Sequence, residues 1–226
     1  MKVKYIVILL LFLFFAQGVI IANIQSRTTD EIQQHIRGGY LYLTTGKWTA
    51  PIDSPPLTAT LAAIPLLFVK DKSKFDNFYK GGQVEYINSD EELFPRKILL
   101  MARIVPLIFM ALLGYFIFLW AKELYGVKAG ILALFLASFS PNLLAFGSIV
   151  TADITGVLFA FLAMYSFWKY ISNPTKKWLI ISGLCFGLAF ISKILSVLLI
   201  PFFILYALII YFFKDFNADF LFNIKK

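Results

Sequence analysis

The sequence has few cysteine, histidine or charged residues, and it lacks the common motifs of soluble enzymes. Its 226 residues include one cysteine and one histidine, and only 15% are charged. A single cysteine permits no disulfide within the chain, and Cys185 lies in an apolar stretch that disfavours the reactive thiolate. Walker loops, GxGxxG followed by an acid, CxxC pairs, HExxH and GxSxG are all absent. Soluble nucleotide chemistry therefore has no recognisable site.

Apolar residues dominate what is present. They make up 60% of the chain, and the mean hydropathy is +0.79, whereas soluble domains contain about 45–50% apolar residues. The apolar blocks are long enough to cross hydrocarbon, which takes about 20 helical residues. The sequence predicts an all-α polytopic membrane protein with about six transmembrane helices: about 5–24, 98–120, 127–147, 154–170, 178–192 and 194–213.

The positive charge is explained by membrane orientation. Lysines and arginines give a net charge of +8, but they form short clusters beside apolar blocks, which is typical of cytoplasmic loops and not of nucleic-acid binding. With Lys2 and Lys4 inside, residues 26–95 lie outside, whereas the turns at 121–128 and 169–177 and the C-terminal tail are cytoplasmic. The run 5–24 exceeds a signal-peptide core of 7–15 residues, which favours an uncleaved first span. We expect a multi-pass protein of the cell (inner) membrane.

Small residues recur at four-residue spacing on two of the expected spans. Ala129, Ala133 and Ala137 share one span, and Gly183 and Gly187 share another. Small residues allow helix backbones to approach closely in lipid. Both sets predict helix packing.

The first outer loop, 26–95, contains nine of the thirteen acidic residues. Thr28 and Glu31 fit a capping box, which predicts a helix that starts there. After a turn at Gly46, residues 54–69 are apolar but broken by prolines and too short to span, so we expect an interfacial or re-entrant helix. A connection this long in a compact protein is usually functional or disordered.

Three residues of this loop are candidates for chemistry. Asp30 and Glu31 fall in the first helical turn, where exposed N–H groups stabilise carboxylates, so a solvated Asp30 and a capping Glu31 are one interpretation. Glu31 and His35 stand four residues apart on one helical face. That spacing suits either a divalent metal or a simple hydrogen bond.

Three ionisable residues lie at the edges of later apolar blocks. Charged groups at membrane depth are costly and usually functional. Asp153 either faces a cavity or sits at the wet start of a helix that Thr151 helps to cap. Lys193 either snorkels or offers a point charge to a phosphate. Arg103, near the outer entry of the second span, is a further candidate for substrate binding.

Four stretches in order resemble bacterial membrane glycosyltransferases of the C-type superfamily, in particular protein O-mannosyltransferase-like and aminoarabinose-transferase-like enzymes. The stretches are TTDEIQQHIRGGYLYLTTG, DSPPLTATLAAIPLL, ELYGVKAGILALFLASFSPNLLAFGSIVTAD and GLCFGLAFISK. The resemblance implies a polyprenyl-phosphate-linked sugar donor and transfer at the outer face to a lipid, glycan or protein acceptor. Relatives often carry His or Lys where this chain has Ser54. They also have further spans, so we interpret 1–226 as a single N-terminal module, and expect a partner chain to supply the missing helices.

The resemblance also implies roles for individual residues. Asp30 corresponds to the catalytic base, with Glu31 beside it. Asp53 and Asp153 correspond to carboxylates that help hold phosphate or a divalent metal, together with Asp30, and Lys193 corresponds to a phosphate contact. Glycosyl transfer needs these parts, because a carboxylate accepts the acceptor's proton while cations stabilise the leaving phosphate.

Two other functions compete with this prediction. A non-catalytic module or scaffold that pairs with a second chain accounts for the short length. Half of a secondary transporter would use Asp153 and Lys193 as coupling charges, but such proteins favour inverted repeats. We find no such repeat, and the acidic outer loop has no role in transport.

Overall fold

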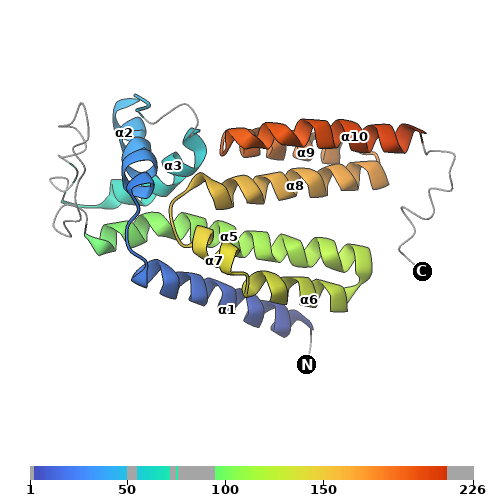
Figure 1. Cartoon of the computed structure of the whole chain (residues 1–226), viewed down its shortest axis with the longest axis horizontal. Helices are drawn as coiled ribbons and strands as arrows, with labels where there is room; N and C mark the ends of the chain where they lie inside the picture. The colour runs from blue at the N-terminus through green and yellow to red at the C-terminus, as the bar shows by residue number, and fades with distance from the viewer. Residues whose placement is uncertain (1–2, 50–54, 72–74, 76–94, 213–226) are drawn as a thin grey trace.

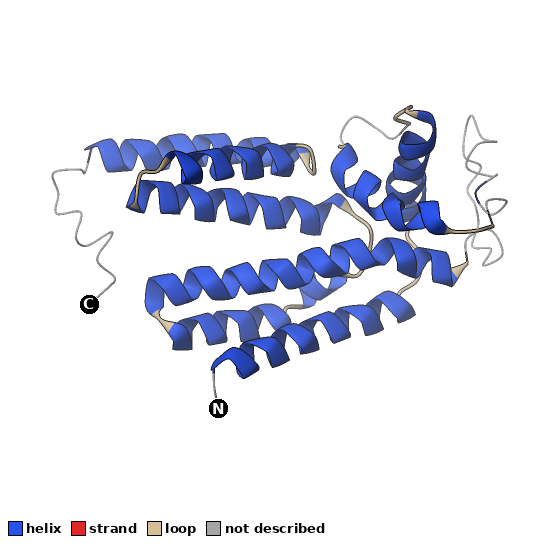
Figure 2. Ribbon diagram, turned by 180° about the vertical axis from the view of Figure 1, so that it is seen from behind, coloured by secondary structure: helices blue, strands red, loops and turns tan. Residues whose placement is uncertain are grey.

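The computed structural model describes residues 3–49, 55–71, 75 and 95–212. Every regular element in this part of the chain is helical, which confirms the predicted all-α membrane class (Figure 2). The elements are α1 (Val3–Ile24), η1 (Glu31–Ile36), α2 (Arg37–Thr45), α3 (Pro56–Ala63), η2 (Ile64–Phe68), α5 (Arg96–Tyr125), α6 (Val127–Ser138), α7 (Pro141–Gly147), α8 (Ala152–Ser172), α9 (Lys176–Phe190), η4 (Ile194–Leu198) and α10 (Leu199–Phe212).

The long helices run side by side and alternate in direction (Figure 1). Helices α1, α5 and α6 lie together, and α8, α9 and α10 lie along the other side of α5. Helices α2 and α3 sit at one end of this bundle, which we call the loop end. Helix α1 begins and α10 finishes at the opposite end, as the predicted topology requires.

Three helices are long and apolar enough to cross a membrane: α1, α5 and α8. Helices α6 and α7 pass the same test together but bend by 61° at their junction, so they make a fourth candidate span. Helix α9 has 15 residues and α10 has 14, fewer than the roughly 20 that a full crossing takes. The number of six transmembrane helices therefore stays a prediction, although each expected span contains a helix.

A polar side chain of α1 supports the break between α6 and α7. Gln17 Nε2 donates a hydrogen bond to the Ser138 carbonyl at 3.3 Å, and Ser148 Oγ donates to Gln25 Oε1 at 2.8 Å. A broken helix at membrane depth frees backbone groups that need partners, because lipid offers none. Gln17 therefore helps to stabilise the bend, whereas Gln25, just after α1, accepts from Ser148 at the end of α7.

The core of the bundle surrounds α5. Phe14, Met110, Leu113, Ile154 and Leu158 belong to one buried cluster that joins α1, α5 and α8. Close packing of this kind, and not a hydrophobic driving force, holds helices together in lipid. This core fixes the relative positions of α1, α5 and α8, whose loop ends carry the candidate residues.

The predicted packing of Gly183 and Gly187 does not form within the described chain. Both glycines of α9 are exposed, and a Cβ built on either would meet no atom within 4 Å. Ala137 of the other small-residue set is buried, as expected. Sequence spacing marks the small face of a helix but does not reveal what lies opposite.

The expected helices of the outer loop are present. The helix after Thr28 runs from residue 29 to residue 45 and includes η1 and α2. Residues 56–68 of the expected apolar segment form α3 and η2, with Ala59, Ala62 and Leu66 fully buried. Helix α3 packs against α2, η1 and α5, so it supports the helix that carries Asp30.

Candidate functional site

A buried ion pair lies at the loop end of the bundle. The side chains of Glu31 and Arg103 are both 0% exposed, and they meet through two parallel hydrogen bonds. Arg103 Nε donates to Glu31 Oε1 at 2.7 Å, and Arg103 Nη2 donates to Glu31 Oε2 at 2.6 Å. This two-pronged geometry is the strongest that arginine and a carboxylate can form.

Further partners complete this pair. Arg103 Nη1 donates to the carbonyls of Ala22 at 2.6 Å and Gln25 at 3.1 Å, and Nη2 donates to the Ser26 carbonyl at 3.2 Å. The Val150 N–H donates to Glu31 Oε1 at 2.9 Å. The pair therefore joins the end of α1, the start of η1, the first third of α5 and the segment just before α8.

This geometry changes the interpretation of two predicted residues. Thr28 Oγ1 accepts from the Glu31 N–H at 3.3 Å, so the threonine half of the predicted capping box forms. The Glu31 carboxylate instead binds Arg103 and Val150, which corrects its expected role as a cap. Arg103, expected to bind substrate, is fully buried and engaged by protein acceptors.

Asp30 lies just before a local change in helix type, and His35 lies within it. Residues Glu31–Ile36 adopt a wider π-helical turn, a feature frequent at functional sites. Asp30 is exposed, and its Oδ1 accepts a hydrogen bond from Gln34 Nε2 at 3.1 Å. His35 is 6% exposed, and its Nδ1 has no hydrogen-bond partner. The expected Glu31–His35 contact is replaced by the Glu31–Arg103 pair.

The surroundings of His35 show which charges lie near it. Burial lowers the pKa of His35 from its ordinary value of 6.5, because it disfavours the charged ring. The carboxylates of Asp30, Asp153 and Glu31 oppose this shift, in that order of size. Asp30 and Asp153 are far apart in sequence, yet both act on the same imidazole.

Asp153 and Lys193 form a second ion pair. Their side chains are about a third exposed, at 32% and 37% respectively. Asp153 stands in the first turn of α8, and Thr151 is the N-cap residue by backbone position. Thr151 makes no capping hydrogen bond, and its Oγ1 is buried without a partner. The structure therefore shows Asp153 as a partner of Lys193, and the expected capping by Thr151 does not form.

Two local features place Lys193. The Leu57 N–H at the start of α3 donates to the Ile191 carbonyl at 3.2 Å, which ties the turn before Lys193 to the outer helices. A Cβ built on Gly156 would lie 3.1 Å from Lys193 Cβ, so the lysine stem passes close to α8 because position 156 is glycine. Sequence reasoning missed Gly156, although its spacing of three from Asp153 puts both on one helical face.

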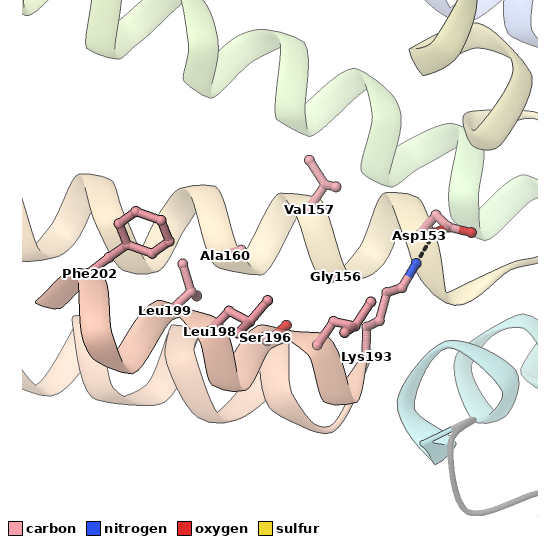
Figure 3. Close-up of a pocket in the computed structure, with 10 residues that line it drawn as sticks. Asp153, Gly156, Val157, Ala160, Lys193, Ser196, Leu198, Leu199 and Phe202 are labelled. Atoms are coloured by element: carbon pink, nitrogen blue, oxygen red, sulfur yellow. Dashed lines mark hydrogen bonds and ion pairs between the residues drawn. The ribbon is translucent and has the colours of Figure 1, made fainter.

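A cavity of about 210 Å³ extends away from this pair between α8, η4 and α10 (Figure 3). Its lining is apolar except at the Asp153–Lys193 end and at Ser196, whose hydroxyl donates to the Ala189 carbonyl at 3.0 Å. The side chains that line it are Asp153, Val157, Ala160, Lys193, Leu195, Ser196, Leu198, Leu199 and Phe202, with Gly156. The cavity thus combines a long apolar wall with one accessible cation.

The structure describes two of the three predicted metal ligands. Asp30 and Asp153 lie in the described part of the chain, whereas Asp53 lies outside it. Among the residues that the structure describes, no group of three His, Cys, Asp or Glu side chains is placed to hold a metal ion. A divalent metal at Asp30, Asp53 and Asp153 stays a prediction.

Comparison with models of protein families identifies the relatives of this chain. The model of the dolichyl-phosphate-mannose-protein mannosyltransferase family matches residues 92–217, which is more than half of the chain. The chain belongs to this family. Membership confirms the predicted relationship to membrane glycosyltransferases. The matched segment includes Arg103, Asp153 and Lys193. Neither a curated protein nor a solved structure matches the chain.

Proposed function

We propose that this mannosyltransferase-family chain takes part in sugar transfer from a polyprenyl-phosphate-linked donor at the outer face of the cell (inner) membrane. The observation that carries the proposal is the apolar cavity with Lys193 at its loop end. An apolar wall suits an isoprenoid tail, and a lysine ammonium suits the phosphate that follows the tail. Short cytoplasmic loops that are rich in lysine support the outer location of this end.

Asp30 is the candidate base. It is exposed at the loop end, and its charge and that of Asp153 both reach His35, which supports their placement in one region. In the reaction, the acceptor oxygen bonds to the anomeric carbon, the bond from that carbon to the phosphate oxygen breaks, and Asp30 takes the acceptor's proton. Lys193 stabilises the negative charge that develops on the leaving polyprenyl phosphate.

The other predicted residues take supporting roles. Glu31 and Arg103 are buried, which favours positioning of the Asp30 helix over contact with substrate. His35 has a free ring nitrogen near Asp30 and Asp153, which favours a hydrogen bond to a substrate hydroxyl group. Asp53 remains a candidate ligand for phosphate or metal. The acceptor is a lipid, a glycan or a protein.

The test is transfer of radiolabel from polyprenyl-phosphomannose in membranes that contain the full chain, with and without a chelator. Lys193→Met removes the cation and keeps the length of the side chain, so transfer is expected to fall. Lys177→Met is the matched control, because Lys177 lies at the opposite end of the bundle. Equal transfer by the two variants would contradict the role of Lys193.

The exposed side of α9 and α10 favours a second candidate function, a module that pairs with another membrane chain. No side chain of α10 is buried among those described, and Gly183 and Gly187 face open space. Small residues on a free helix face allow close approach of another helix. Cross-linking from an introduced cysteine at Gly183 tests this, with Cys185 replaced by serine; a partner that restores transfer would identify an enzyme assembled from two chains.

A further inference from the structure

The lysine that the proposed donor phosphate would contact, Lys193, is already paired with the carboxylate of Asp153. Asp153 and Lys193 are the charged residues among those that line the cavity, and they already form an ion pair. A phosphate that approaches Lys193 therefore meets a carboxylate bound to the same ammonium group. Like charges that share a site repel one another, so the phosphate and Asp153 cannot both be close without cost.

We propose that Asp153 competes with the donor's phosphodiester for Lys193 and thereby lowers the affinity of the cavity for the anionic donor. This inference rests on the proposed function. A neutral lipid is not subject to this competition, because it does not bind the ammonium group through an opposite charge.

The geometry suits an exchange of partners. Both side chains are about a third exposed, and ion pairs with such exposure are weak and readily broken. The lysine stem passes close to Gly156, with 3.1 Å between Lys193 Cβ and a Cβ built on the glycine. The tie from Leu57 to Ile191 holds the turn itself. The base of Lys193 is therefore held by the backbone around it, while its ammonium group has access to the cavity (Figure 3).

This role has the opposite effect on donor affinity from the role that the sequence predicts for Asp153. If Asp153 helps to hold the phosphate, its removal weakens donor binding. If Asp153 competes with the phosphate, its removal strengthens binding, because Lys193 loses its other partner and the like charge disappears. The direction of one affinity change therefore separates the two roles.

The experiment measures binding of polyprenyl-phosphomannose to the full chain in nanodiscs of neutral phosphatidylcholine. Asp153→Asn is expected to raise the affinity about threefold, the size of effect that a partly exposed pair supplies. Lys193→Met is expected to lower it about tenfold through loss of a charge-assisted contact. The double variant should bind less tightly than Asp153→Asn, because it lacks the ammonium group, and no more weakly than Lys193→Met, because it also lacks the repelling carboxylate.

A polyprenol of equal tail length, which has no phosphate, is the second probe. The parent should bind it weakly, and Asp153→Asn should not tighten its binding, because the freed ammonium group gains no anionic partner. The ratio of the two affinities therefore rises in Asp153→Asn and falls in Lys193→Met. An Asp153→Ser variant repeats the measurement if Asp153→Asn does not fold.

Glycine variants test the placement of the lysine. Gly156→Ala should weaken binding of the phosphodiester, because a methyl group there presses on the Lys193 stem, whereas Gly183→Ala should bind like the parent. Weaker binding by Asp153→Asn would overturn the competition and leave the proposed function intact. A parent that binds neither probe would overturn both together.

Discussion

Replacing Arg103 by methionine should destabilise the protein far more than any loss of a helix cap. The change removes the cation that Glu31 binds, although the Glu31 side chain is 0% exposed. Of the hydrogen bonds described for this carboxylate, the one from the Val150 N–H remains. It also removes donors from the carbonyls of Ala22, Gln25 and Ser26. Removal of one partner of a buried pair costs about 3–5 kcal/mol, whereas loss of a cap costs about 1 kcal/mol.

Thermal unfolding in detergent, followed by tryptophan fluorescence, measures this effect. A loss of this size lowers the melting temperature by on the order of 10 °C in a chain of this length. Lys169→Met is the matched control, because Lys169 pairs with Glu123 at 2.7 Å but is 25% exposed. We expect the control to lose about 1 kcal/mol.

Two outcomes would refute this reasoning. The first is a melting temperature of Arg103→Met that is no lower than that of Lys169→Met. The second is a further fall in melting temperature when Glu31→Gln is added to Arg103→Met. We expect Glu31→Gln to recover part of the loss in the double variant, because it removes the unpaired charge that makes the single variant costly. A double variant that is more stable than Arg103→Met supports the buried pair.

Three further predictions concern the loop end. Asp30→Asn should lower sugar transfer about 10²-fold or more if Asp30 is the base, with donor binding unchanged; transfer at the parent rate would place the base elsewhere. A cysteine at exposed Lys47, in a chain with Cys185 replaced, should react with an impermeant thiol reagent outside intact cells, and labelling only after permeabilisation would reverse the topology. The pKa of His35 in the folded chain lies below its ordinary value of 6.5, so the unfolded chain binds more protons than the folded chain as the pH falls through 6.5. Burial of the neutral imidazole therefore contributes to stability above that pH, and the contribution is lost below it. Melting temperatures between about pH 8 and pH 5.5 should therefore fall less steeply in His35→Gln, and parallel profiles would contradict the assignment.

Much of the architecture follows from the local order of residues. Apolar blocks and their flanking lysines predict the helices and their alternating directions, because a membrane imposes the same solvent rule on each segment independently. The sequence also indicates which charged residues gather at the loop end, since helix direction alone assigns Asp30, Asp153 and Lys193 to one side. Thr28 marks the start of the outer helix for a local reason, its hydrogen bond three residues along the chain.

The pairing of these charges is decided by tertiary structure. Glu31 and Arg103 are 72 residues apart, and Asp153 and Lys193 are 40 apart. Neighbouring carboxylates such as Asp30 and Glu31 look alike in a sequence, yet Glu31 is buried against Arg103 of α5, whereas Asp30 is exposed. Which acid is free for chemistry depends on distances across the bundle, and these arise only when the helices pack.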